Sequence, residues 1–440
     1  MLQAPKRFVN WFYYYAIGLN LSRRTRILGI LTLSIFVITV QTLSLLTPEN
    51  PNQYCGPTIY FMNVFHLHVV CDSYWYLMDG QDPSRLIHGG DSLTARNSVI
   101  QDRPLITTLA FLISRFIILI PGFNRSIPYS GKDDFVINYS LSVYLGFIII
   151  NFMTMLITLL LCISIFKFNK QKTSNLDNNR NFLLLLLLLV STNEVTRIYF
   201  WLPNSILFNN FIPIYMLWLI YARNRLINNK FYFTQSIFLA FSMLIYPMFL
   251  VCVPLWAYLA IKSRRYFSAA SICIILTPWV IWPLIINVLG GNYLNNGAKN
   301  FDQFTWIIKS ATEGRLLETS FYNLFTFVSS LPKIPIIGIL IGFSYLFLNS
   351  FLSKKSFSSL DFIRKFLPEI IGGVTYFLWI FLIGMYERRW SWGFLLFIIA
   401  IIISEISVKQ RRNRYLYKIM FTFLVCLNVF SWVFSPPPAS

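Results

Sequence analysis

Residues 139–166 read YSLSVYLGFIIINFMTMLITLLLCISIF and contain no charged side chain. A helix needs about 20 apolar residues to cross the roughly 30 Å hydrocarbon core of a bilayer, so this stretch is long enough to span one. Of the 440 residues in the chain, 56% are apolar or aromatic and only 12% are charged. Soluble domains carry about 25% charged residues, so the composition argues against a water-soluble enzyme, a disordered protein or a disulfide scaffold. We predict an all-α polytopic membrane protein.

Eleven apolar stretches are predicted to cross the membrane within one transmembrane domain that covers residues 1–440. Two of them are separated by Tyr246-Pro247, because a proline there favours two short spans over one overlong helix. Thr-Pro-Glu-Asn follows the first stretch in place of a small-x-small cleavage site, so that stretch is predicted to stay as a span. The predicted spans are 27–46, 139–166, 181–196, 205–222, 231–246, 248–261, 266–287, 333–351, 367–384, 393–408 and 416–434.

The positions of Lys and Arg predict the orientation of these spans. With the N-terminus in the cytoplasm, most of the 37 Lys and Arg residues fall in cytoplasmic segments, as the positive-inside rule requires. The net charge of +20 then belongs to short runs beside membrane lipids, and no nucleic-acid partner is predicted. A bacterial inner membrane is favoured over the endoplasmic reticulum, because no retention signal ends the sequence.

Two predicted outer segments, 47–138 and 288–332, are long enough to hold a functional site. Within the first, residues 71–80 predict a short amphipathic helix. At 3.6 residues per turn, one face of this helix carries Asp72, Trp75, Tyr76 and Asp79. A carboxylate beside aromatic rings at a membrane surface suits a general base for a sugar or lipid hydroxyl, because partial desolvation raises its pKa. A solvated interfacial helix, kept wet by its aspartates, is the alternative.

A second helix is predicted over residues 104–120, where Pro104 suits the first turn. We expect it to lie on the outer membrane surface. If it crossed the bilayer, Arg115 would sit at mid-membrane and the basic cluster that begins at Lys167 would move to the outside.

Metal ligands and a disulfide are further candidates in the first outer segment. His66 and His68, together with Asp72, could bind a divalent metal, because imidazole and carboxylate suit zinc or manganese. Surface histidines without a metal are the alternative reading. Cys55 and Cys71 lie on the predicted oxidising side and could form a disulfide.

The order of these elements resembles the GT-C superfamily of membrane glycosyltransferases. The resemblance is greatest to the polyprenyl-phosphate-dependent branch that includes protein O-mannosyltransferases and aminoarabinose transferases. In that family an acidic residue opens a helix in the first outer loop, a basic-Pro-Leu step opens a second one, and an aromatic and basic cluster precedes a late span. A span that ends in Pro-Trp also leads into a second outer loop. The matching residues are Asp72, Arg103-Pro104-Leu105, Pro278-Trp279 in the span before the second outer segment, and Tyr386-Glu387-Arg388-Arg389-Trp390. The chain departs from the pattern at Asp72-Ser73, where an acidic pair is usual, and by an insertion at residues 122–138.

The resemblance implies transfer of a sugar from a polyprenyl-phosphate donor to an acceptor hydroxyl on a glycan, lipid or protein. The reaction would take place on the non-cytoplasmic face with inversion at the sugar. Asp72 would be the base, and Asp79 and Asp102 are second choices as base or as acceptors of sugar hydroxyls. No cofactor is assigned with certainty, and a divalent metal at His66 and His68 stays open.

The same resemblance implies cations that hold the departing phosphate. Arg388, Arg389 and Arg103 are the candidates, because the forked donors of arginine fit phosphate oxygens. Interfacial snorkelling of the Arg388–Arg389 pair is the alternative. Trp75 and Tyr76 would stack on a sugar, or would only belong to an interfacial aromatic belt.

Two other functions remain as alternatives. A membrane enzyme that polymerises or ligates lipid-linked glycans would share the outer loop and the arginines, but usually carries its long loop later in the chain. A lipid or solute transporter would place ionisable groups in the middle of its spans, and they are scarce here.

Overall fold

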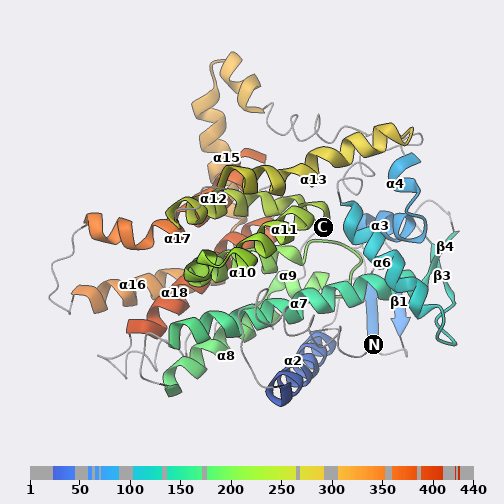
Figure 1. Cartoon of the computed structure of the whole chain (residues 1–440), viewed down its shortest axis with the longest axis horizontal. Helices are drawn as coiled ribbons and strands as arrows, with labels where there is room; N and C mark the ends of the chain where they lie inside the picture. The colour runs from blue at the N-terminus through green and yellow to red at the C-terminus, as the bar shows by residue number, and fades with distance from the viewer. Residues whose placement is uncertain are drawn as a thin grey trace.

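A computed structural model describes residues 23–44, 58–61, 65–68, 71–88, 103–130, 136–170, 176–263, 268–291, 306–351, 359–383, 388–409, 422, 425 and 426. Long helices run side by side along the length of the molecule (Figure 1). They are α2 (Arg23–Ser44), α3 (Cys71–Gln81), α4 (Arg85–His88), α6 (Pro104–Ile117), α7 (Leu141–Lys170), α8 (Leu176–Thr192), α9 (Glu194–Tyr199), α10 (Phe208–Ala222), α11 (Asn229–Ile245), α12 (Cys252–Lys262), α13 (Ser268–Val288), α15 (Leu316–Ser330), α16 (Lys333–Phe351), α17 (Ser359–Ile383) and α18 (Arg388–Lys409), with short 3₁₀ helices η4 (Arg223–Ile227) and η5 (Pro247–Val251).

The helical prediction is confirmed for the first ten apolar stretches, each of which coincides with a helix. The eleventh, 416–434, lies almost wholly outside the described residues. Over the described residues, two helices are long and apolar enough to cross a bilayer, Leu141–Phe168 and Ala269–Val288. The bent pair formed by α15 and α16 would make a third. The prediction of eleven spans is therefore not confirmed by helix length and composition.

Two short antiparallel hairpins, which the sequence did not predict, accompany the helices. Strands β1 (Thr58–Phe61) and β2 (Phe65–His68) form the first. Strands β3 (Ser126–Ser130) and β4 (Val136–Ser140) form the second, which leads directly into α7. The insertion at 122–138 is thus largely a hairpin between α6 and the longest helix of the bundle.

The centre of the bundle is α10, in which all but one of the 15 residues are buried. It packs against α7, α12, α17 and α18. Small residues bring the helices together, because a glycine without a Cβ lets two backbones or a backbone and a large side chain approach. A Cβ at Gly146 of α7 would lie 2.6 Å from the carbonyl oxygen of Ala110 in α6, and one at Gly372 of α17 would lie 2.7 Å from Phe397 in α18.

The bundle has two ends, which differ in the helices that gather there. The helices α3, α4 and α6 and the second hairpin gather at one end, which we call the loop end, and α16 and α17 extend to the opposite end (Figure 1). The guanidinium of Arg225 lies over the ring of Phe168, so η4 sits where α7 terminates, away from the loop end. The turn after α13 returns to the loop end, where a Cβ on Gly291 would collide with the carbonyl oxygen of Ile87 in α4.

Large apolar side chains are exposed along the outside of several long helices. In α13 only 17% of the most apolar window is buried inside the protein. Soluble monomers rarely expose such extended apolar surface, which is the normal exterior of a helix in contact with hydrocarbon. The exposed residues include Leu28, Leu31 and Ile35 of α2, Phe233, Ile237 and Phe241 of α11, Val280 and Leu284 of α13, and Leu340 and Phe343 of α16.

Candidate functional site

The helix predicted at residues 71–80 is present as α3, and it packs against α6 and α7. Gly80 permits this packing, because a Cβ there would lie 2.8 Å from Cγ1 of Val143. One turn earlier, the buried ring of Tyr76 meets Phe147 edge to face, with 5.8 Å between the ring centres. The packing of α3 on α7 therefore fixes the position of the Tyr76 hydroxyl.

The first residue before α6 supplies the cation of the site. Pro104 occupies the first turn of the helix and Arg103 stands immediately before it. Nη1 of Arg103 donates hydrogen bonds to the Tyr76 hydroxyl and to Oγ of Ser205, the latter at 2.8 Å. The two hydroxyls are themselves hydrogen-bonded at 2.9 Å. Cζ of Arg103 also lies 5.1 Å from the centre of the Tyr246 ring, within the range of a cation–π interaction.

Ser205 belongs to an irregular segment, residues 200–207, that is almost entirely buried between α9 and α10. Buried backbone outside helices and strands needs other partners for its polar groups. Asn151 of α7 supplies one, since its Nδ2 lies 3.3, 3.0 and 2.9 Å from the carbonyl oxygens of Tyr199, Phe200 and Leu202. The side chain of Asn151 thereby holds the start of the segment against α7.

A second set of polar side chains holds α9 in place. The side chain of Asn193 caps α9 by accepting a hydrogen bond from the backbone N–H of Thr196 at 3.0 Å. Nδ2 of Asn210, in the first turn of α10, donates to Oγ1 of Thr196 at 2.6 Å and to Oδ1 of Asn193 at 3.3 Å. These bonds tie the end of α8 and the start of α10 to α9, so the segment that carries Ser205 is closed on both sides.

The contacts continue from Arg103 toward the start of α18. The hydroxyl of Tyr246 donates to Oδ1 of Asn209 at 3.0 Å. A Cβ on Gly393 of α18 would lie 2.8 Å from the backbone oxygen of Asn209, so the helix approaches that backbone closely. Arg388 and Arg389 occupy the first turn of α18, shortly before Gly393. Arg103, immediately before α6, and the first turn of α18 therefore both lie near Tyr246 and Asn209.

Asp79 is the titratable group of the site with the clearest perturbation. It lies on α3 one turn after Tyr76 and is 6% exposed. Burial, which disfavours the charged form, is the main cause that raises the pKa of Asp79 to about 7, and the nearby Arg85 opposes the rise. A carboxylate with a pKa near neutrality can take up and release a proton at physiological pH.

Known proteins offer no guide to this arrangement. No protein family, curated protein or solved structure matches the chain. One guanidinium with two hydroxyls beside it is suited to an anionic oxygen group such as a phosphate, and a carboxyl of near-neutral pKa is suited to proton transfer.

The structure brings together part of the predicted set of site residues. Arg103 and Tyr76 are in contact, and Asp79 follows Tyr76 on the same helix. The backbones of Asp72 and Trp75 lie in α3 and those of Arg388 and Arg389 in α18, but the described side chains do not include these four, and Asp102 lies outside the described residues.

The predicted metal site and disulfide fall beyond the described side chains. His66 and His68 lie on β2, opposite Tyr60 and Thr58 of β1 in the backbone register. Among the side chains that the structure does describe, no three His, Cys, Asp or Glu residues form a group that could hold a metal. Cys55 and the side chain of Cys71 lie outside the described part, so their pairing stays a prediction.

Sequence reasoning missed the residues that the bundle contributes to the site. Ser205, Asn209 and Tyr246 were assigned only to apolar spans or to a turn between them. A signal was present in the interruption of the apolar pattern by Asn193 and by Pro-Asn-Ser at 203–205. Local pattern does not show that these polar residues face Arg103, which is about one hundred residues earlier in the chain.

Proposed function

We propose that this protein is a membrane glycosyltransferase that moves a sugar from a polyprenyl-phosphate donor to an acceptor hydroxyl. The acceptor would be a glycan, lipid or protein on the non-cytoplasmic face. The observation that carries the proposal is the convergence of Arg103, Tyr76, Ser205 and Tyr246 at the loop end. Tyr76 lies on α3 and Arg103 stands immediately before α6, the two helices whose sequences resemble GT-C enzymes, and the cluster has the chemistry of a phosphate site.

The arrangement of charge and apolar surface supports the membrane part of this proposal. The exposed apolar side chains of α2, α11, α13 and α16 suit a lipid environment. Basic residues gather at the end of the bundle opposite to the site, which would be cytoplasmic by the positive-inside rule. About eleven spans, with α3 and α6 at the outer surface of a bacterial inner membrane, remain part of the proposal. The basic residues include Lys167, Arg223, Arg225, Lys230 and Lys262.

In the proposed reaction Arg103 binds the phosphate of the donor. Its guanidinium would exchange one of its contacts with the Tyr76 and Ser205 hydroxyls for a phosphate oxygen, while the Tyr246 ring keeps it in place. As the acceptor oxygen attacks C1 of the sugar, the bond from C1 to the phosphate oxygen breaks and the polyprenyl phosphate leaves with the electron pair. A carboxylate takes the acceptor proton.

Two carboxylates compete for the role of base. The resemblance implies Asp72, which stands in the first turn of α3. The burial and raised pKa of Asp79 favour this second residue, because a base works best when its pKa lies near the operating pH. The two residues are two helical turns apart on α3. In the proposed reaction one of them acts as the base and the other holds sugar hydroxyls.

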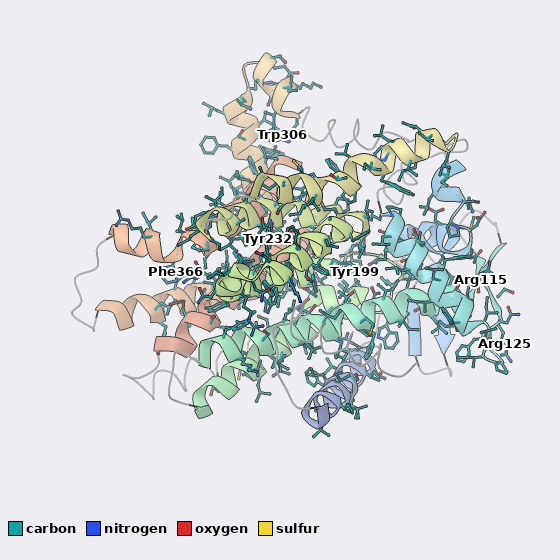
Figure 2. All side chains as sticks on the ribbon, in the orientation of Figure 1. Arg115, Arg125, Tyr199, Tyr232, Trp306 and Phe366 are labelled. Carbon is teal, nitrogen blue, oxygen red and sulfur yellow. The ribbon has the colours of Figure 1, made fainter. Side chains whose placement is uncertain are left out.

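Transfer of labelled sugar in proteoliposomes tests the proposal. The donor would be polyprenyl-phosphate sugar from a host lipid extract, and the variants would be Asp72→Asn, Asp79→Asn and Arg103→Lys. We expect one of the two Asn variants to lose transfer while donor binding remains, and Arg103→Lys to weaken donor binding, because lysine lacks the planar fork. Arg115→Lys is the matched control, since Arg115 lies on the outer edge of α6, stacked on Phe111 (Figure 2).

Three outcomes of this assay would count against the proposal. If the wild type neither binds nor uses any donor across a broad panel, the glycosyltransferase assignment fails. If Asp72→Asn and Asp79→Asn both transfer at the wild-type rate, the assigned bases are wrong. If Arg103→Lys binds donor as tightly as Arg115→Lys does, the phosphate site lies elsewhere.

A transporter is the second candidate, because one observation favours it. The chain is interrupted between α8 and α10 by α9 and the buried segment 200–207, and discontinuous helices of this kind form substrate sites in transporters. The buried amides of Asn193 and Asn210 are, however, hydrogen-bonded to one another and to Thr196. Uptake of labelled lipid-linked sugar into the same vesicles, without transfer to an acceptor, would favour a transporter over a glycosyltransferase.

A further inference from the structure

A helical hairpin stands away from the bundle between α13 and α16 (Figure 1). Its first arm is a helix over residues 306–312 and its second arm is α15. The turn between them contains Gly314 with a φ of +71°, a left-handed conformation that glycine adopts without strain. Arg315 forms an ion pair with Glu313 at the same turn, so the tip of the hairpin is polar.

The base of the hairpin is packed firmly onto α17 and α18. Nε1 of Trp306, which Figure 2 labels beside the hairpin, donates to the backbone oxygen of Leu382 at 3.0 Å. Phe327 of α15 meets the ring of Phe377 edge to face at 5.4 Å and that of Phe394 at 6.1 Å. These contacts at both arms fix the direction in which α15 leaves the bundle.

The two faces of α15 differ in polarity. Every residue of this helix is described, and Phe327 alone is buried. At 3.6 residues per turn, one stripe about 100° wide carries large apolar side chains that are between 37% and 75% exposed. They are Leu317, Phe321, Leu324, Phe325 and Val328. The opposite face carries Glu318, Thr319, Asn323, Thr326 and Ser329, with the amphipathic ring of Tyr322 among them and Leu316 at its edge.

The angle between α15 and α16 indicates what covers the apolar stripe. The two helices are joined by Leu331 and Pro332 alone and are bent by 93° relative to each other. The helix α16 is highly apolar and exposes Ile337, Leu340 and Phe343 on its outer side. A helix of this kind that runs along the bilayer normal would force α15 to lie in the plane of the membrane.

We propose that α15 is an interfacial helix that lies flat on the membrane, with its apolar stripe in the boundary between headgroups and acyl chains. The inference rests on the membrane location in the proposed function. It goes further by naming the lipid surface as the partner of the second outer loop. Its chemistry fits this partner: an apolar stripe with aromatic rings, a polar opposite face, and continuity with the exposed apolar side of α16. A second copy of the chain would be the competing occupant.

The bend between α15 and α16 also indicates how deep in the membrane the candidate site would lie. Leu331 packs against a buried cluster that includes Tyr199 of α9, Leu202 and Ile206 of the irregular segment, and Trp392 of α18. The segment that carries Ser205 therefore lies at the level at which α15 leaves α16. If α15 marks the headgroup layer, Arg103 and Ser205 lie at that layer too, where the phosphate of a lipid-linked substrate would be found.

Site-directed spin labelling tests this inference in the full chain. Single cysteines would replace Leu317, Phe321, Phe325 and Val328 on the stripe and Thr319, Asn323 and Thr326 on the opposite face. The background would be a variant with its six native cysteines replaced and a melting temperature matching that of the wild type. The protein would be placed in vesicles of phosphatidylethanolamine and phosphatidylglycerol. Leu340→Cys in α16 serves as the reference position for the membrane interior.

We expect collisions with dissolved oxygen, relative to those with a water-soluble nickel complex, to be several-fold more frequent on the stripe than on the opposite face. The four stripe labels should report one depth, because a flat helix does not change depth along its length. The label at Leu340 should lie deeper. A steady change of depth from residue 317 to residue 328 would overturn the flat orientation.

The remaining outcomes separate this inference from the proposed membrane location. If all labels on α15 meet the nickel complex while Leu340→Cys is in lipid, the helix projects into water and the inference fails alone. If Leu340→Cys also meets the nickel complex, the proposed membrane location fails. Immobile stripe labels that meet neither reagent would mean that protein covers the stripe, and the inference would again be wrong.

Discussion

The guanidinium of Arg103 lies over the ring of Tyr246, with 5.1 Å between Cζ and the ring centre. The ring is available at this point because α11 ends at Ile245 and Pro247 opens η5, so the chain cannot continue as a regular helix. The Tyr246 hydroxyl is held in turn by Asn209. A proline break in one part of the chain thereby positions a cation that precedes it by more than one hundred residues.

Removing the Tyr246 ring should weaken the hold on Arg103. A partly desolvated cation–π contact contributes about 0.5–2 kcal/mol, so Tyr246→Leu is expected to reduce donor affinity roughly 2- to 30-fold. Tyr246→Phe keeps the ring and loses only the hydrogen bond to Asn209, so its affinity should stay closer to wild type. Equilibrium binding of a fluorescent polyprenyl phosphate measures both. Equal losses in the two variants would show that the hydroxyl matters and the ring does not.

A methyl group at Gly393 should destabilise the protein. It would lie 2.8 Å from the backbone oxygen of Asn209 and would collide with the Tyr376 hydroxyl. Overpacking of this kind costs about 1–3 kcal/mol. We expect Gly393→Ala to lower the melting temperature in detergent. Gly29→Ala in α2 is the matched control, since its added Cβ would meet no other part of the described structure within 4 Å, and it should be neutral or stabilising. Similar melting temperatures for the two variants would contradict the close approach.

Stability should fall as the pH rises, because of Asp79. Its pKa is about 7 in the folded protein and near the ordinary value of 3.8 when unfolded. Between these values the folded state holds a proton that the unfolded state releases, so the free energy of unfolding decreases with increasing pH, by at most about 4 kcal/mol in all. Asp79→Asn should flatten this profile, and Glu318→Gln should not. The free energy of unfolding at pH 5 and at pH 8 measures this dependence. If Asp79→Asn shows the same change between the two pH values as the wild type, Asp79 is not its cause.

Replacing Asn151 should loosen the buried segment before α10. Asn151→Leu removes a donor shared by the carbonyl oxygens of Tyr199, Phe200 and Leu202, at a cost of about 1–3 kcal/mol for the groups left without it. Hydrogen exchange should become faster over residues 199–207 and stay unchanged in α13. Asn323→Leu on α15 controls for loss of an amide as such. Unaltered exchange in the Asn151→Leu variant would mean that the carbonyls find other partners.

Much of the helical architecture followed from local pattern. Long apolar runs such as 139–166 and the break at Pro247 predicted α7 and the separation of α11 from α12, because burial and proline chemistry act over a few residues. The hairpin β3–β4 was missed, because its strands are short and are held by the packing of α3 and α7 as much as by their own sequence. The short helix α9 was missed because its cap at Asn193 lies inside an apolar stretch.

The candidate site was only half accessible to the same reasoning. Arg103 and Tyr76 stand out locally, since each begins or lies on a helix with a mixed polar and aromatic face. Ser205 and Tyr246 are marked only by a polar interruption and by a proline break, and their contacts with Arg103 arise only when the chain folds. The raised pKa of Asp79 likewise depends on how deeply α3 is buried, which sequence spacing alone does not determine.

The three carbonyls that share the Asn151 side chain also bear on the order in which α7 and residues 199–202 must be synthesised. The helix α7 precedes residues 199–202 in the chain and is synthesised first, so its amide is available when those carbonyls must be withdrawn from water. A segment without a hydrogen-bonded helix of its own could not enter an apolar environment ahead of that partner. If the protein is inserted into a membrane as proposed, a chain rearranged so that α7 is synthesised last would leave the segment without this partner during insertion, although every contact of the finished protein remained available.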